Sequence, residues 1–347
     1  MNRILYLDWI RVFAIFAVMV LHASSTFLYQ FQKIDMNAWW IANIYDSMVR
    51  MAVPLFFMIT GVIFLKMKSE PLKLFFKKRF IKIIIPLIAW SFVYILFRKY
   101  ILNQDIILLK DIILSFFRKE YYHLWFLYSL IGIYLFIPIL KIFIEYSSTT
   151  LQYYFIILFI ISSAIVPIVT DILHIDIPNY LTMMQGFGGY LVLGYLLSNI
   201  KITTKIFYMA VIFIMISTSV TIIGTYYLSF NEGVFNGFFY DNFSITTIIQ
   251  TSSYFIVLKY FGEKINTFKN ISINNSIIVV GITSFGIYLI HPLVMWVLEN
   301  KINITLPILY YVPVLSIATF LLSFIIVYYR LFDAKNPFSK IYGAIKL

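Results

Sequence analysis

The 347-residue chain contains no cysteine. Disulfides, thiolate metal sites and a cysteine that carries an acyl group are therefore all excluded. Charged residues are also scarce, at 12% of the chain, whereas soluble domains average roughly a quarter. Long apolar runs take their place, and such runs favour membrane-spanning helices over the short alternating strands of a β-barrel. The sequence predicts an all-α, polytopic integral membrane protein.

Apolar runs of about 20 residues predict ten spanning helices in one membrane domain over residues 1–347. Ten spans put both termini on one side of the membrane. With a cytoplasmic N-terminus, 18 lysines and arginines fall on the inner side and 7 on the outer side, as the positive-inside rule requires. The net charge of +12 is therefore a topology signal and predicts no nucleic-acid partner. The predicted spans are 7–29, 41–65, 80–98, 123–144, 151–170, 186–199, 206–228, 240–262, 275–297 and 305–329.

One outer loop is basic, against the rule. Within it, residues 105–119 (DIILLKDIILSFFRK) place Asp111, Ser115 and Arg118 on one helical face. The pattern predicts an interfacial helix. The alternative is an outer-surface site for an anionic acceptor such as a lipid pyrophosphate.

Two ionisable residues in the first span are eleven positions apart. Arg11 and His22 therefore lie on one helical face, separated by a rise of roughly 16 Å. Asp8 precedes Arg11 by three residues and is expected to pair with it. Ionisable groups within spans are costly and usually face a cavity or a partner. An Arg11 that reaches the interface and a His22 that bonds a neighbouring helix form the structural alternative.

Arg50 lies deep in the second span. Asp46, one turn earlier, predicts a buried ion pair with it. Pro54 is expected to kink this helix, and Gly61 to allow close packing.

The chain has only four histidines, and three are predicted to meet at one depth near the outer surface. These are His22, His123 and His291, and with Arg50 nearby they predict a polar chamber. His174 falls in an outer loop and is expected to be incidental. No metal site is predicted, because no histidines stand at the i, i+4 spacing of helical zinc sites. The G-x-S-x-G motif of serine hydrolases is also absent.

Five segments in register resemble the membrane acyltransferase-3 family. They are LDWIRVFAIFAVMVLH, RMAVPLFFMITGVIFL, KKRFIKIIIP, YYHLWFLYSLIGIYLFIPIL and SFGIYLIHPL. Through VPLFFMI-G and YHLWF, the resemblance is greatest to the enterobacterial-common-antigen O-acetyltransferases. It implies a polytopic helical fold that moves acyl groups, usually acetyl from acetyl-CoA, onto hydroxyls of surface glycans in a bacterial cytoplasmic membrane. The soluble domain of some members is not expected here.

The resemblance also implies the donor site. The arginine and histidine that the family separates by ten residues match Arg11 and His22. Its basic R-x-x-R appears as Arg79 followed by Lys82, so the second planar fork is lost. Arg79, Lys82 and Lys78 are expected to hold the CoA phosphates, and Arg11 the diphosphate or an amide of the pantetheine arm.

The expected reaction centre is His22, acting as general base or as transient acyl acceptor. Arg50 is the first candidate for the oxyanion donor, with three alternatives: His123, Tyr128 or His291. Trp125 and the neighbouring tyrosines are expected to stack on the acceptor sugar.

Other functions remain compatible with the residues alone. A transporter or flippase for a glycan lipid or small solute would also have many helices with arginine and histidine inside them, although no inverted repeat is evident. An accessory subunit of a glycan-assembly complex, and an acyltransferase with a succinyl donor, are the remaining alternatives. The sequence predicts neither the acceptor nor the oligomeric state.

Overall fold

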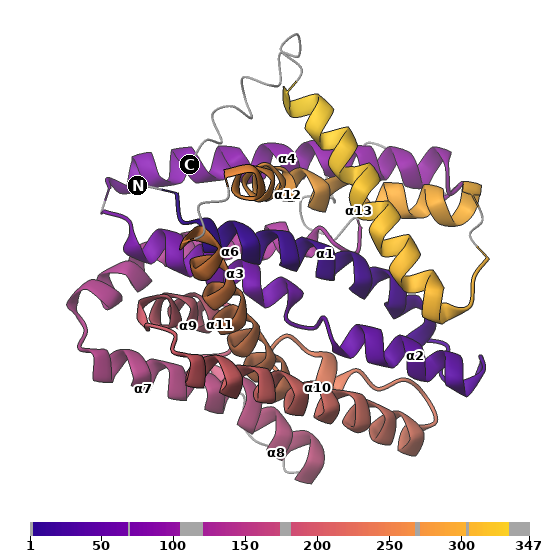
Figure 1. Cartoon of the computed structure of the whole chain (residues 1–347), viewed down its shortest axis with the longest axis horizontal. Coiled ribbons are helices and arrows are strands. Elements are labelled where there is room, and N and C mark those ends of the chain that lie inside the picture. Colours follow the sequence, from indigo (N-terminus) through magenta and orange to yellow (C-terminus); the bar gives the residue numbers. More distant parts are fainter. Residues whose placement is uncertain are drawn as a thin grey trace. The chain divides into compact units, whose positions relative to one another are not determined.

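A computed structural model describes residues 3–68, 70–104, 121–173, 182–267, 271–302 and 305–332. Throughout these ranges the regular elements are helices, as predicted (Figure 1). The predicted interfacial helix over 105–119 and His174 lie outside the described residues.

The helices follow one another with short connections. They are α1 (Leu5–Leu28), α2 (Met36–Ser47), α3 (Ala52–Lys66), α4 (Leu72–Tyr100), α6 (Trp125–Tyr146), α7 (Thr149–Ile160), the π-helix η1 (Ile161–Ile165), α8 (Val166–Leu173), α9 (Gly188–Asn199), α10 (Thr204–Glu232), the 3₁₀-helix η3 (Phe238–Tyr240), α11 (Ile245–Thr267), α12 (Ile271–Val297), the π-helix η4 (Leu298–Ile302) and α13 (Ile308–Phe332).

Helices occupy all ten predicted spans, and eight helical stretches among the described residues are long and apolar enough to cross a membrane. The protein is therefore a multi-pass membrane protein, and the count of ten is approximate. The two predicted spans below these limits are α9, which has only 12 residues, and α11. Helix α11 is less apolar because polar side chains such as Gln250 and Lys259 are buried along it.

The chain forms two compact units, residues 1–63 with 150–347, and residues 64–149. In the first unit α1 packs against α2, α11, α12 and α13, and α10 packs against α11 (Figure 1). In the second unit α4 packs against α6. Helix α1, which carries Arg11 and His22, is thus surrounded by the other helices of its unit.

Two glycines let α3 and α9 touch along their backbones. A Cβ atom at Gly61 would meet the backbone of Leu191, and one at Gly194 would meet the backbone of Met58. Such contact between small residues is how helices pack closely in membranes. The predicted role of Gly61 is confirmed.

Lys259 of α11 closes the end of the same short helix. Its side chain is buried, and Nζ donates hydrogen bonds to the carbonyl oxygens of Leu197, Ser198 and Ile200 at 3.1, 2.9 and 2.6 Å. The last carbonyls of a helix have no partner within it and interact favourably with a cation. One buried lysine therefore satisfies the C-terminus of α9.

The second predicted span is interrupted, not merely kinked. Helix α2 ends at Ser47, residues 48–51 form a turn, and α3 begins at Ala52. Pro54 explains the position of the break, because it has no N–H to donate to the carbonyl of Arg50 and its ring clashes with that carbonyl. Arg50 therefore lies in a turn between two helices, and the prediction of one continuous helix over 41–65 is wrong.

Candidate active site

Arg50 is held in the turn by contacts on two sides. Its guanidinium forms an ion pair with Asp46, as predicted from the sequence. NH1 donates a hydrogen bond to the backbone oxygen of Tyr240 at 3.4 Å, and Cζ lies 4.0 Å from the centre of the Tyr240 ring. A cation over an aromatic face is stabilised by the ring quadrupole. Arg50 thus has a defined direction as well as a charge.

The same ion pair connects Arg50 to the helix that carries His22. Asp46 is fully buried and also accepts a hydrogen bond from Ser24 Oγ at 3.0 Å. Ser24 follows His22 by two residues in α1. The positive charge of Arg50 acts on the His22 ring. The base and the cation expected for acyl transfer are therefore neighbours.

Tyr240 is itself fixed from below. Its hydroxyl donates to Asn43 Oδ1 at 2.5 Å, and Ser47 Oγ lies 3.2 Å from that hydroxyl. Asn43 Nδ2 in turn donates to the backbone oxygen of Ile222 at 3.0 Å. Buried polar groups need such partners, because each one left without a partner costs its full desolvation. The network makes the ring under Arg50 a rigid support.

Gln250 bridges the break between α2 and α3. Its Oε1 accepts from the Met51 backbone N–H at 3.1 Å, and its Nε2 donates to the Ser47 backbone oxygen at 2.8 Å and to Thr218 Oγ1 at 2.9 Å. An interrupted helix leaves backbone groups unsatisfied on both sides of the break. One side-chain amide satisfies a group on each side, so it fixes the turn that holds Arg50.

Replacing Gln250 by leucine should therefore lower the rate of the catalysed reaction without touching the reacting groups. Two buried backbone groups would lose their partner, at about 1–3 kcal/mol each, and the turn at Arg50 would shift. We expect kcat to fall at least tenfold with a smaller change in KM, and the melting temperature to fall as well. Gln250→Glu, which keeps the acceptor but loses the donor, should have an intermediate effect.

Ser252→Ala is the matched control on the same helix, because Ser252 Oγ bonds only to the backbone of its own helix, at Ile248. It should change neither quantity. A Gln250→Leu protein with wild-type kcat would show that the bridge does not position Arg50.

His291 lies beside His22, and its ring orientation follows from Pro292. Because Pro292 has no N–H, the carbonyl of Tyr288 loses its helical donor. His291 Nδ1 occupies that place, 2.6 Å from the Tyr288 oxygen. Since a carbonyl only accepts, Nδ1 carries the proton, and in the neutral ring Nε2 carries the lone pair. The His22 and His291 rings are stacked, with centroids 5.2 Å apart and planes inclined by 20°.

Arg11 belongs to a second charged cluster in the same unit. Its NH1 lies 2.7 Å from Asp8 Oδ1, which confirms the predicted pair. Arg3, which was not anticipated, donates to both oxygens of the same carboxylate at 2.7 and 2.9 Å. Asp8 is fully buried, and Gly281 leaves room for it. Two guanidinium groups on one carboxylate leave a net positive charge that can bind an anion.

The basic residues predicted to hold phosphates lie in the second unit. Arg79 is buried, pairs with Glu70, and lies over the Phe75 and Phe64 rings at 4.5 and 5.4 Å. Lys78 also pairs with Glu70, at 3.1 Å. Lys82 is exposed. The cluster is thus three cations around one carboxylate that already neutralises part of their charge.

His123 is also in the second unit, in the turn before α6. It is buried and lies edge-on to the Tyr94 and Tyr121 rings, at 5.0 and 5.7 Å between centroids. Trp125 and Tyr128 are half-buried, one turn apart at the start of α6. This aromatic group is compatible with the predicted sugar platform, which stays a prediction.

The structure brings together three of the predicted residues, His22, Arg50 and His291. Their arrangement with His123, Trp125 and the basic cluster stays a prediction, because those residues belong to the other unit. In the part of the chain that is described, no group of three or more histidine or acidic side chains is placed to hold a metal ion.

Three supporting residues, Ser24, Tyr240 and Gln250, were missed from the sequence. Only the stripe that leads to Arg50 had a readable signal. Asn43, Ser47 and Arg50 follow the i, i+4, i+7 spacing of a helical face, which marks a buried polar surface.

Chemically, the centre combines an imidazole that can take a proton with a guanidinium that can stabilise an oxyanion. The family model described as an acyltransferase domain matches residues 4–328. No curated protein and no solved structure matches the chain. An acyltransferase requires an acyl donor and an acceptor, and nearly the whole chain is covered by the match. The protein belongs to the acyltransferase-3 family of membrane acyltransferases.

Proposed function

We propose that the protein is an O-acetyltransferase that moves an acetyl group from cytoplasmic acetyl-CoA to a hydroxyl of a cell-surface glycan or its lipid-linked precursor. The observation that carries the proposal is the placement of His22 beside Arg50 and His291 within a chain of this family. The enzyme acts in the bacterial inner membrane with both termini in the cytoplasm, as one domain over the whole chain. The similarity to enterobacterial-common-antigen O-acetyltransferases supports a glycan acceptor.

In the simplest route, His22 accepts the proton of the acceptor hydroxyl as its oxygen attacks the thioester carbonyl. The carbonyl oxygen becomes an oxyanion, which Arg50 stabilises by hydrogen bonds. The C–S bond then breaks, the ester is complete, and CoA leaves as the thiol with the proton from His22. Proton transfer of this kind contributes about 10²–10⁴-fold to a rate.

In the second route, His22 attacks the thioester itself and holds the acetyl group before the hydroxyl takes it. His291 then accepts the hydroxyl proton through Nε2, the nitrogen that the bond to Tyr288 leaves with a lone pair. Both routes use the same residues and differ in whether a covalent intermediate forms.

The donor is bound through its phosphates by Arg79, Lys82 and Lys78, and through its diphosphate or pantetheine arm by Arg11. Removing the charge of Arg79 and Lys82 together should therefore raise the KM for acetyl-CoA about tenfold or more, because charge-assisted bonds to phosphate are lost. The KM for the glycan should stay unchanged. An unchanged KM for acetyl-CoA would remove these residues from the donor site.

Glu70 provides a variant with the opposite sign. Its burial favours the neutral acid, but hydrogen bonds from Lys78 and Arg79 and their positive charges lower the pKa of Glu70 below its ordinary value. The pairs therefore persist above that pKa and are lost only as the pH falls through it. Glu70→Gln, which imitates the protonated acid, should lower the KM for acetyl-CoA at low salt, and added salt should abolish the difference.

The function is tested by transfer from radiolabelled acetyl-CoA in membranes that contain the protein and surface glycans with free hydroxyls. Label in the glycan, dependent on the protein, supports the proposal. If only succinyl-CoA labels the glycan, the acetyl assignment is wrong. If neither donor labels any glycan despite normal expression, the proposed donor or acceptor is wrong.

A further inference from the structure

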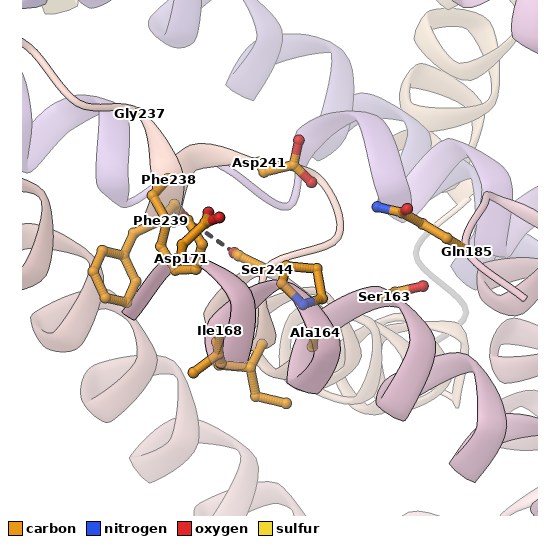
Figure 2. A pocket seen from close by; sticks show the side chains of 12 residues that line it. Ser163, Ala164, Ile168, Asp171, Gln185, Gly237, Phe238, Phe239, Asp241 and Ser244 are labelled. Carbon is orange, nitrogen blue, oxygen red and sulfur yellow. Dashed lines mark hydrogen bonds between the residues drawn. The ribbon is translucent and has the colours of Figure 1, made fainter. Parts of the chain in front are cut away.

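A separate cavity of about 400 Å³ lies in the first unit, where η1 and α8 meet residues 237–245 (Figure 2). Its size falls within the range of about 300–1,000 Å³ that small-molecule sites occupy. The lining is mixed, with the Phe238 and Phe239 rings on one side and carboxylate, amide and hydroxyl groups elsewhere. The proposed reaction does not yet use these groups.

The π-helix η1 places a serine at this cavity. Pro167 cannot donate to the carbonyl of Ser163, and the next N–H, that of Val166, bonds five residues back to Ile161. Such single-turn π segments are frequent at functional sites. Ser163 lines the cavity, is only 2% exposed, and its Oγ has no hydrogen-bond partner. Since buried hydroxyls in proteins are almost always bonded, this one is placed to bond a ligand.

Two carboxylates at the cavity are also available. Asp171 is exposed and makes no hydrogen bond or ion pair among the described residues, and Asp241 uses only Oδ1, which accepts from the Phe243 backbone N–H at 2.7 Å. No lysine, arginine or histidine lines the cavity. Phosphate or carboxylate ligands are therefore repelled, whereas hydroxyl and amine groups find acceptors. Gln185 adds amide donors beside them (Figure 2).

The cavity adjoins the candidate active site through η3. Tyr240 supports Arg50 with its ring and backbone oxygen, and its chain neighbours Phe239 and Asp241 line the cavity. Ser244 Oγ donates to the Phe239 backbone oxygen at 3.1 Å and secures this segment. A ligand in the cavity is therefore bound one residue away from the support of Arg50.

We infer that this cavity binds the sugar of the acceptor, and that it selects an uncharged or amine-bearing sugar over one that carries phosphate or carboxylate. The inference rests on the proposed function and adds the class of acceptor to it. Asp171 and Asp241 accept hydrogen bonds from the sugar, Ser163 contributes its hydroxyl, and the apolar rings cover a face of the sugar. The lipid pyrophosphate of a carrier-linked acceptor lies outside this cavity.

The kinetic test uses Asp171→Asn, Asp241→Asn and Ser163→Ala. Hydrogen bonds to charged groups are the stronger ones, so each aspartate variant should raise the KM for the glycan about tenfold, with Ser163→Ala somewhat less. The KM for acetyl-CoA should stay unchanged in all three. Glu232→Gln is the matched control, because this exposed carboxylate of α10 binds only Asn236. An unchanged glycan KM in both aspartate variants would overturn the assignment.

The absence of native cysteine allows a direct binding test. Ile168, which lines the cavity, becomes the only cysteine of the Ile168→Cys variant, and a neutral maleimide reports its accessibility. The probes are the neutral and the acidic glycan-lipid fractions of the producing cells. The neutral fraction should slow labelling at least fivefold and the acidic fraction should not. Adding Asp171→Asn and Asp241→Asn should abolish the protection.

The two proposals can fail separately. Protection of the cysteine without acetyl transfer in the wild type would remove the proposed reaction and keep a glycan-binding cavity. Transfer to a glycan that leaves labelling unchanged would keep the reaction and overturn the cavity. Protection by the acidic fraction alone would overturn the selectivity.

Discussion

The His22→Ala variant should lose acetyl transfer by a factor of at least roughly 10²–10⁴, the contribution of a positioned general base, while it is still inserted in the membrane. The imidazole has no other side chain nearby with the same position, because the His291 ring is committed through Nδ1 to the Tyr288 oxygen. The measurement is label transferred from acetyl-CoA per amount of protein in the membrane.

His174→Ala is the matched control, since this histidine is expected to be incidental. It should retain full activity. Substantial transfer by His22→Ala would remove His22 from the chemistry. Rapid quenching of the wild type with labelled acetyl-CoA and no glycan separates the two routes: label on His22 indicates the covalent route, and its absence in an active enzyme indicates direct transfer.

The second large effect is expected for Arg50→Lys. The planar guanidinium can bond Asp46 and an oxyanion together, whereas an ammonium is a point charge with a different reach. Loss of one oxyanion donor costs about 10²–10³ in kcat, and KM for either substrate should change little. The protein should remain folded, because Asp46 keeps a positive partner.

Two further variants separate catalysis from stability. Arg50→Leu alone leaves Asp46 as an uncompensated buried charge and should destabilise the protein by about 3–5 kcal/mol. The double variant Arg50→Leu with Asp46→Leu removes both charges and should recover much of that stability without recovering activity. If Arg50→Lys, or the double variant, transfers acetyl groups at the wild-type rate, Arg50 has only a structural role.

Local pairs were predictable because they depend on helical spacing alone. Asp8 with Arg11, and Asp46 with Arg50, are three and four residues apart, and both pairs form. The close approach at Gly61 followed from the absence of a side chain. Pro54 was correctly expected to disturb its helix, but whether it bends or interrupts the helix depends on partners for the freed backbone groups, and Gln250 supplies them from α11.

By itself, the sequence determined that this is a multi-pass helical membrane protein of the acyltransferase-3 family, since apolar length, charge distribution and short motifs are properties of the chain taken in order. Tertiary structure alone decided the rest. The His22–His291 stack, the Tyr240 ring under Arg50 and the cavity at Ser163 each join residues from distant helices; Tyr240 is 190 positions from Arg50. A membrane helix buries whichever face its neighbours cover, and hydropathy does not say which helices become neighbours.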